Sequence, residues 1–221
     1  MFVVIFEVKP KTEQWEEYLS LAKLLRPELE KIDGFIDNER FSSTKHRGKI
    51  LSLSTWRDEK SLIRWRTHTL HHNVQDKARS TILVNYHLRV GEVFSDTQPP
   101  LGHKVQEQRF DETETGEAKT VVIAEAWQEE STLHSSEKIR ESTGFVSEEI
   151  FESIYQPGKF LQMTGWTDID AASVAKDQLL VSGNRSRYRE VRVIRDYGMS
   201  DRVEAPQYHP EVELTQEALI W

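Results

Sequence analysis

Apolar residues follow two patterns along the first half of this chain, one typical of strands and the other of amphipathic helices. Residues 2–9 are rich in Val, Ile and Phe, which predicts a strand. Residues 12–31 place apolar side chains three and four positions apart, which predicts a helix that Pro27 should kink or break. Further along, the pattern predicts strands over 35–43, 49–56 and 81–95, and helices from Asp58 to about 66 and over 68–79.

The same order recurs in the second half. Residues 34–58 and 144–168 align without a gap at an offset of 110, and ten of these 25 positions are identical. A repeat of this length is as long as a domain, so the chain is a tandem duplication. The second copy predicts strands over 119–127, 145–154, 159–166 and 185–197, and helices over 130–141 and from Asp168 to about 181.

These patterns divide the chain into two domains of the same kind. We expect domains over 1–97 and 119–198, a Pro- and Gly-containing linker over 98–118, and a tail over 199–221 that either docks as a short helix or frays. The βαββαβ order is that of the ferredoxin-like fold, an α+β fold with helices on one face of an antiparallel sheet. Two open faces packed together close a barrel-like enclosure, either within one chain as a pseudo-dimer or across a homodimer.

Composition narrows the choice of partners and compartment. The formal net charge of −8 at pH 7 disfavours nucleic acid and anionic membranes, since both demand a concentrated basic surface. Cysteine is absent, so thiolate chemistry and disulfides play no part. The N-terminus lacks a signal-peptide pattern and no apolar run is long enough to span a bilayer, so we expect a cytoplasmic protein.

Several residues of the first copy are landmarks at element ends and faces: Gly34-Phe35, Gly48 to Asp58, Trp65-Arg66, His71, Gln75, Arg79, Tyr86 and Arg89-Val90. Together they resemble a known family, the antibiotic biosynthesis monooxygenase (ABM) domain of the dimeric α+β barrel superfamily. The second copy resembles the family through Gly144-Phe145, Gly158 to Asp168 and Tyr188 to Tyr197, but it lacks the Trp65 and His71 pattern. The landmarks follow strands and helices, so they bear on the fold more than on the activity.

The resemblance implies a cofactor-independent monooxygenase that oxidises an aromatic or polyketide-like small molecule with molecular oxygen. Other members degrade haem, so a haem-binding or haem-degrading enzyme is an alternative, and a non-catalytic small-ligand-binding stress protein is another. His71 falls where the resemblance places the helix histidine, as a proton donor or a haem ligand. The alternative is that His71 lies on the solvated rim of a helix and has no functional role.

Glu7 lies on a largely apolar strand, as its equivalent Glu125 does in the second copy. Such an acid could have a raised pKa and act as a general base toward a phenol. The alternative is a cross-strand ion pair with Arg89, and correspondingly of Glu125 with Arg192.

The strand over 81–95 alternates two sets of side chains. Ile82, Val84, Tyr86, Leu88 and Val90 should face the helices, whereas Leu83, Asn85, His87 and Arg89 should face the open side of the sheet, where the last three line a cavity. His87 aligns with Glu190, which would make the two copies unequal. We therefore expect an apolar cavity at the open sheet face, with Glu7, His71, His87 and Arg89 as catalytic residues and Asn85 and Trp65 in the substrate pocket.

His68 and His72 are spaced for a shared metal ion, but no third ligand is apparent, so no metal site is predicted. Trp56 and Trp166 each precede a helix-capping Asp by two residues and should anchor that corner by burial.

Overall fold

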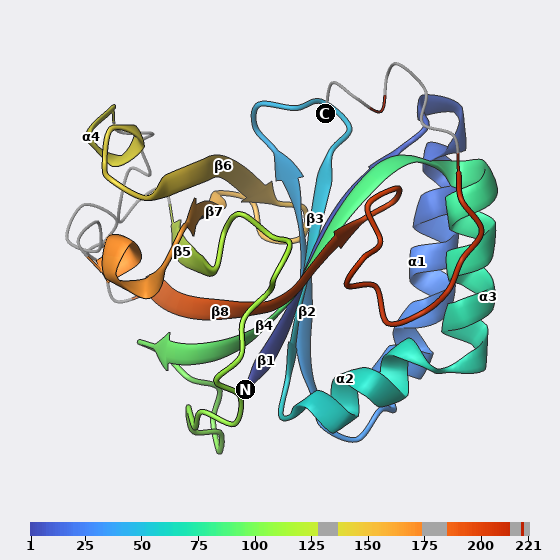
Figure 1. Cartoon of the computed structure of the whole chain (residues 1–221). Coiled ribbons are helices and arrows are strands. Elements are labelled where there is room, and N and C mark those ends of the chain that lie inside the picture. The colour runs from blue at the N-terminus through green and yellow to red at the C-terminus, as the bar shows by residue number, and fades with distance from the viewer. Residues whose placement is uncertain (128–136, 174–184, 213–217, 219–221) are drawn as a thin grey trace.

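The computed structural model describes residues 1–127, 137–173, 185–212 and 218. In these parts of the chain, antiparallel strands form one closed barrel in the order β1-β3-β2-β6-β7-β5-β8-β4 (Figure 1). The strands are β1 (Phe2–Pro10), β2 (Phe35–Ser43), β3 (Ile50–Trp56), β4 (Leu83–Asp96), β5 (Thr120–Trp127), β6 (Phe145–Ser153), β7 (Lys159–Trp166) and β8 (Arg187–Gly198). The helices are α1 (Trp15–Glu30), α2 (Glu59–Arg66), α3 (Thr69–Lys77) and α4 (Glu137–Arg140), with a 3-10 turn over Thr12–Gln14 and a π-helical turn over Ala78–Ile82.

The predicted elements match these closely. Alternation placed every strand within two residues of its observed ends, and Asp58 caps α2 by accepting a hydrogen bond from the Ser61 amide. Pro27 lies inside α1, which continues to Glu30, so of the two expected effects, a kink or a break, the break is wrong. Residues 169–173 are helical as predicted, whereas most of the helix expected over 130–141, residues 174–181 and the apolar end of the tail lie outside the described residues.

The two copies join within the chain, edge to edge. Strand β2 pairs with β6 and strand β4 pairs with β8, both antiparallel, and these two ladders close the barrel. An edge strand carries unpaired backbone donors and acceptors, and closure removes all such edges. The duplicated half therefore supplies the partner that a single ferredoxin-like sheet lacks.

The barrel interior is packed with side chains from both halves. Val3, Ile5, Phe41, Phe151 and Val191 are fully buried in one core cluster. Eight strands give an interior about wide enough for side chains to fill. A polar cavity of about 530 Å³ opens at one end of this interior, beside Glu125, Lys159 and Arg189. Its lining does not include Glu7, His87 or Arg89, so the apolar cavity that we expected around those residues is wrong.

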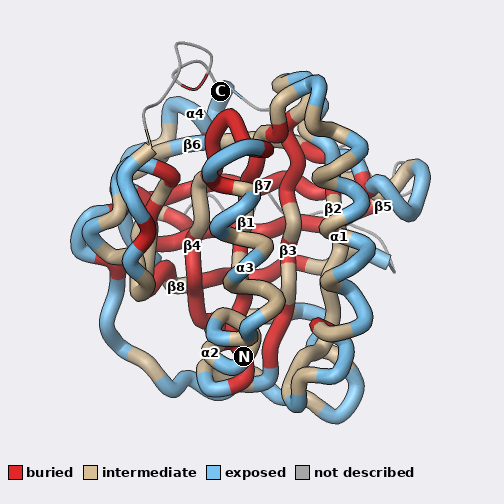
Figure 2. The backbone as a smooth tube through the Cα atoms, turned by 90° about the vertical axis from the view of Figure 1, so that its right-hand side faces the viewer, coloured by how far each residue is buried: buried red, intermediate tan, exposed pale blue. Residues whose placement is uncertain are grey.

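A layer of helices covers the outer face of the first half. Figure 2 shows α1 and α3 in front of the buried strands β4, β1 and β3. Trp56 and Trp166 are fully buried at the strand ends, which confirms their structural role. The tail after β8 turns back along α3, with Met199 donating its amide hydrogen to the carbonyl of Tyr86 (Figure 1).

None of the helices in the described parts of the chain has the length and apolarity that crossing a membrane requires.

Candidate active site

A cavity of about 220 Å³ lies between the helix layer and the outer face of the first-half sheet. Its floor is formed by outward-facing side chains of β1, β2, β3 and β4, and its walls by α1, α2, α3 and the tail. The apolar lining includes Phe6, Leu21, Leu25, Leu62, Leu88 and Val90. A predominantly apolar cavity with a few polar groups is the usual form of a small-molecule site.

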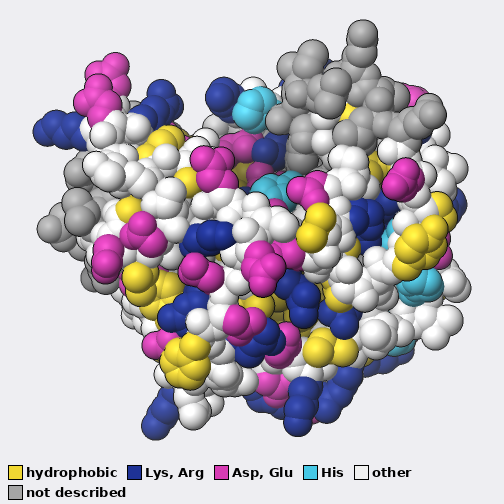
Figure 3. Space-filling model, in the orientation of Figure 1, with side chains coloured by type: hydrophobic (Ala, Val, Ile, Leu, Met, Phe, Trp, Pro, Cys, Tyr) yellow, Lys and Arg dark blue, Asp and Glu magenta, His cyan; other side chains and the backbone are white. Residues whose placement is uncertain are grey.

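The charged part of the lining is entirely basic. Among the described residues that line the cavity there is no Asp or Glu, whereas five arginines and two histidines line it: Arg26, Arg40, Arg66, Arg79, Arg202, His71 and His209. This contrasts with the net charge of −8 and with the outer surface. Figure 3 shows acidic and basic side chains interspersed over the face it displays. The cavity therefore favours an anionic or electron-rich ligand.

His71 lies on α3 with its ring against the cavity. The ring stacks on Trp65 with centroids 4.3 Å apart, and Nδ1 lies 3.1 Å from the Trp65 carbonyl oxygen. Because a carbonyl oxygen can only accept, Nδ1 carries the proton and Nε2 keeps a lone pair. Burial of the ring lowers the pKa of His71 to about 4, so the imidazole is neutral at pH 7. Nε2 can accept a proton, and it is also the nitrogen that the haem alternative would use as ligand.

The lowered pKa of His71 predicts a pH dependence of stability. The ordinary pKa of about 6.5 applies to the unfolded chain, so between pH 6.5 and 4 the unfolded state binds more protons than the folded state. The contribution of His71 to the free energy of unfolding should therefore be constant above pH 6.5. It should fall by about 2–3 kcal/mol as the pH drops to 4. Urea unfolding of the wild type and His71→Gln across this range measures it. Equal slopes for both proteins would contradict the assignment.

The structure divides the predicted site residues between two places. Trp65 and His71 line the cavity. Glu7 and Arg89 are buried on the other face of the sheet, at one end of the barrel interior, and His87 lies beside them. From Tyr86 onward the predicted alternation of β4 is confirmed, since Tyr86, Leu88 and Val90 face the helices. Leu83, which we expected on the open face, lines the same cavity, because the pairing with β1 shifts register there.

Asn85 is hydrogen-bonded to the C-terminal tail. It donates a hydrogen bond from Nδ2 to the carbonyl of Ala218 at 2.9 Å, and its Oδ1 accepts from the Tyr86 amide. It does not line the cavity. Asn85 therefore holds a residue of the C-terminal tail close to the start of β4.

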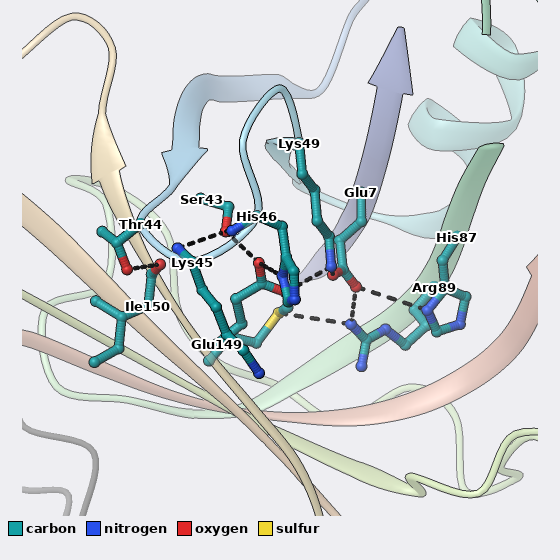
Figure 4. A network of polar contacts seen from close by, with 11 residues as sticks. Glu7, Ser43, Thr44, Lys45, His46, Lys49, His87, Arg89, Glu149 and Ile150 are labelled. Carbon is teal, nitrogen blue, oxygen red and sulfur yellow. Dashed lines mark hydrogen bonds and ion pairs between the residues drawn. The ribbon is translucent and has the colours of Figure 1, made fainter. Parts of the chain in front are cut away.

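Glu7 is the centre of a buried ion-pair network (Figure 4). It pairs with the Arg89 guanidinium, and its Oε1 lies 2.7 Å from the Lys49 ammonium, which also bridges to Glu149 of the other half. The charges of Arg89 and Lys49 outweigh the effect of burial, the largest single influence, and lower the pKa of Glu7 to about 2. The expected raised pKa is wrong, and the alternative, a Glu7–Arg89 ion pair, is confirmed.

The second copy repeats this network with one correction. Glu125 pairs with Arg189 and, at 2.7 Å, with Lys159, which bridges back to Glu39 of the first half. The predicted Glu125–Arg192 pair is wrong, because Arg192 lies on the opposite face of β8 from Arg189 and pairs with Glu107. Ladder positions also match His87 with Arg187, both opposite the glutamate of the first strand, and not with Glu190.

His68 and His72 do not share a site in the structure, although their spacing in the sequence would suit a shared metal ion. His68 stacks near Trp65 with centroids 5.7 Å apart, whereas His72 lies beside Asp76 and His209. One donor atom from each of His72, Asp76 and His209 lies within 4.8 Å of the others, which is the arrangement that could hold a metal ion. The sequence could not have shown this, because His209 comes from the tail and only the fold brings it to α3.

The comparisons with known proteins agree with this architecture. The family model for antibiotic biosynthesis monooxygenase matches residues 1–77, which carry most of the cavity lining. A protein of Pyricularia oryzae named jasmonate monooxygenase ABM is 40% identical over 220 residues, covering 95% of this chain and 99% of that protein.

Solved structures support the fold alone. An aldoxime dehydratase in complex with butyraldoxime has a TM-score of 0.56 at 11% identity, covering 87% of this chain and 79% of that one. A second aldoxime dehydratase has a TM-score of 0.53 at 10% identity, covering 87% and 81%. The relative that matches nearly end to end, together with the family model, settles the family: the chain belongs to the antibiotic biosynthesis monooxygenase family and is a monooxygenase of the ABM type.

Proposed function

We propose that this protein oxidises a small amphipathic carboxylate of the jasmonate type with molecular oxygen, in the cavity beneath α1, α2 and α3. The observation that carries the proposal is the cavity lining, which is apolar except for arginines and histidines and contains no carboxylate among its described residues. An apolar body with one anionic group complements such a lining. The relative named for jasmonate supports the same substrate class.

In this proposal His71 is the proton acceptor. Its Nε2 lone pair takes a proton from a CH2 group of the substrate, and O2 adds at that carbon to give a hydroperoxide. Loss of water from the hydroperoxide leaves a C=O group, so that one oxygen atom enters the product, the other leaves as water, and O2 is the only oxidant needed. Trp65 fixes the His71 ring by stacking and through its carbonyl. Glu7, His87 and Arg89, which we expected to be catalytic, stabilise the barrel instead. The aromatic substrate implied by the resemblance gives way to a carboxylate, because the basic lining is better matched by an anion.

The test is oxygen consumption with jasmonic acid as substrate, with isotopically labelled oxygen and mass spectrometry of the products. We expect oxygen uptake that depends on the substrate, and a product that carries one labelled oxygen atom. Absence of uptake and of an oxygenated product with jasmonic acid, and with other small apolar carboxylates, would remove the proposed function.

A cavity-filling variant tests where the reaction takes place. Ala22 on α1 lines the cavity, so Ala22→Trp should fill much of its 220 Å³ and lower kcat/KM by about tenfold or more. Leu24 lies on the same helix, is 52% exposed and does not line the cavity, so Leu24→Trp should leave kcat/KM unchanged. Steady-state kinetics on both variants, with circular dichroism to check the fold, decides the matter. Equal activities would place the substrate elsewhere.

A further inference from the structure

We propose that Arg66 binds the carboxylate of the substrate, so that the enzyme accepts free acids and discriminates against their esters and amides. This inference rests on the proposed function and assigns the specificity of the same site to one residue.

Arg66 lies in the last turn of α2, is partly buried and lines the cavity. Its backbone carbonyl accepts a hydrogen bond from the Gln207 side chain, which fixes the tail beside it. Its guanidinium, in contrast, has no hydrogen bond or ion pair with any described residue, and its Nε is buried without a partner. An unsatisfied buried donor on a cation is costly, so a ligand that pairs with it gains the energy of that pairing.

Each of the other arginines of the cavity already has a partner. Arg26 pairs with Glu30 at 2.8 Å. Arg40 donates to the hydroxyl of Tyr155 at 2.9 Å, and both Arg79 and Arg202 donate to the hydroxyl of Tyr86. The Nε of Arg40 is also buried without a partner, but the Tyr155 hydroxyl holds its guanidinium. Arg66 is therefore the arginine of this lining, within the described chain, whose whole guanidinium is left for an incoming anion.

No neighbouring acidic group takes the place of a carboxylate ligand on Arg66, among the described residues. Glu59, whose charge reaches Arg66, is itself held by both of its oxygens on Arg109, at 2.7 and 2.8 Å. Burial raises the pKa of the neighbouring Tyr197 to about 12, so its phenol is neutral and does not compete at neutral pH. A planar guanidinium binds a carboxylate through two parallel hydrogen bonds, which an ester or amide cannot match.

The geometry also links this anchor to the reacting group. Arg66 directly follows Trp65, the residue on which His71 stacks. A substrate whose carboxylate lies on Arg66 has its apolar body in the same cavity as Leu62, Leu88 and Val90, with His71 in the wall. Arg66 is thus a binding residue, and His71 remains the proton acceptor.

Binding of jasmonic acid and of its methyl ester, measured by calorimetry without oxygen, tests this inference. The wild type should bind the acid at least about tenfold more tightly than the ester, since a hydrogen bond to a charged group gives about that factor. Arg66→Gln should lose that preference by weakening binding of the acid alone, and Arg66→Lys should retain part of it. The control is Arg64→Gln on the same helix, an arginine that is 52% exposed, pairs with Asp33 and does not line the cavity.

The outcomes separate the inference from the function on which it rests. Arg66→Gln should melt at or above the wild-type temperature, because the substitution removes an unpaired, partly buried cation. The same acid preference in wild type and Arg66→Gln would overturn the role of Arg66 and leave the proposed function standing. A wild type that binds neither compound would overturn both.

Discussion

The His71→Ala variant should retain its fold and lose about a hundredfold or more of kcat with jasmonic acid. Positioned proton transfer contributes about 10²–10⁴ to a rate, and the Nε2 lone pair of His71 is the acceptor in this account. Because the wild-type pKa is lowered to about 4, the imidazole is already neutral at pH 6, so the wild-type rate should show no titration of this group near pH 6.5. Steady-state rates between pH 5 and 8 measure both effects.

The matched control is His72→Ala, the next residue on α3, whose side chain is 42% exposed and does not line the cavity. Its kcat should stay near that of the wild type. His71→Ala with more than about a tenth of the wild-type kcat would show that the proton acceptor lies elsewhere.

The Glu7→Ala variant should lose about 3–5 kcal/mol of unfolding free energy, because it leaves the buried cations of Arg89 and Lys49 uncompensated. Glu125→Ala should lose a similar amount, since Glu125 pairs with Arg189 and Lys159 in the second half. The pKa of Glu7, lowered from 4.5 to about 2, adds a pH signature. This contribution is complete above pH 4.5 and is lost as the pH falls toward 2.

Urea unfolding at pH 7 measures these losses. The control is Glu30→Ala, which removes an exposed partner of Arg26 and should cost no more than about 1 kcal/mol. A loss below about 1 kcal/mol for Glu7→Ala would mean that the network contributes little to the barrel. Glu7→Gln that folds but loses kcat as His71→Ala does would restore the catalytic role that the structure argues against.

Alternation along single strands predicted much of this structure. The period of two identified which residues of β4 face the helices, and apolar surroundings drew attention to Glu7. Alternation cannot tell which of the two faces retains empty space, because that depends on how side chains from other strands and helices pack. Residues such as Phe151 and Val191 fill the middle of the barrel. The predominantly apolar cavity lies beneath the helices, whereas the cavity at the end of the barrel beside Glu125 and Arg189 is polar.

The wrong partner for Glu125 has a simple physical origin. Matching β4 to β8 with an offset of 103 aligned Arg89 with Arg192, whereas the ladders pair Ile5 with Arg89 and Ile123 with Arg189, an offset of 100. An error by an odd number of residues moves a side chain to the opposite face of a strand. Arg192 consequently points out of the barrel toward Glu107.

The basic character of the cavity was beyond the reach of the sequence. Its arginines come from α1, β2, α2, the turn after α3 and the tail, far apart along the chain. The unpaired state of Arg66 is a property of packing, since Glu59 on the same helix is taken by Arg109 of the segment between β4 and β5. No local pattern distinguishes Arg66 from Arg64.

A crystal structure of the protein with jasmonic acid, grown without oxygen, tests the central claim most directly. The account predicts the ligand between the helix layer and the outer faces of β1, β3 and β4, with its carboxylate on Arg66 and its body in reach of His71. A ligand bound in the barrel interior beside Glu7, or on the outer surface with this cavity empty, would contradict it.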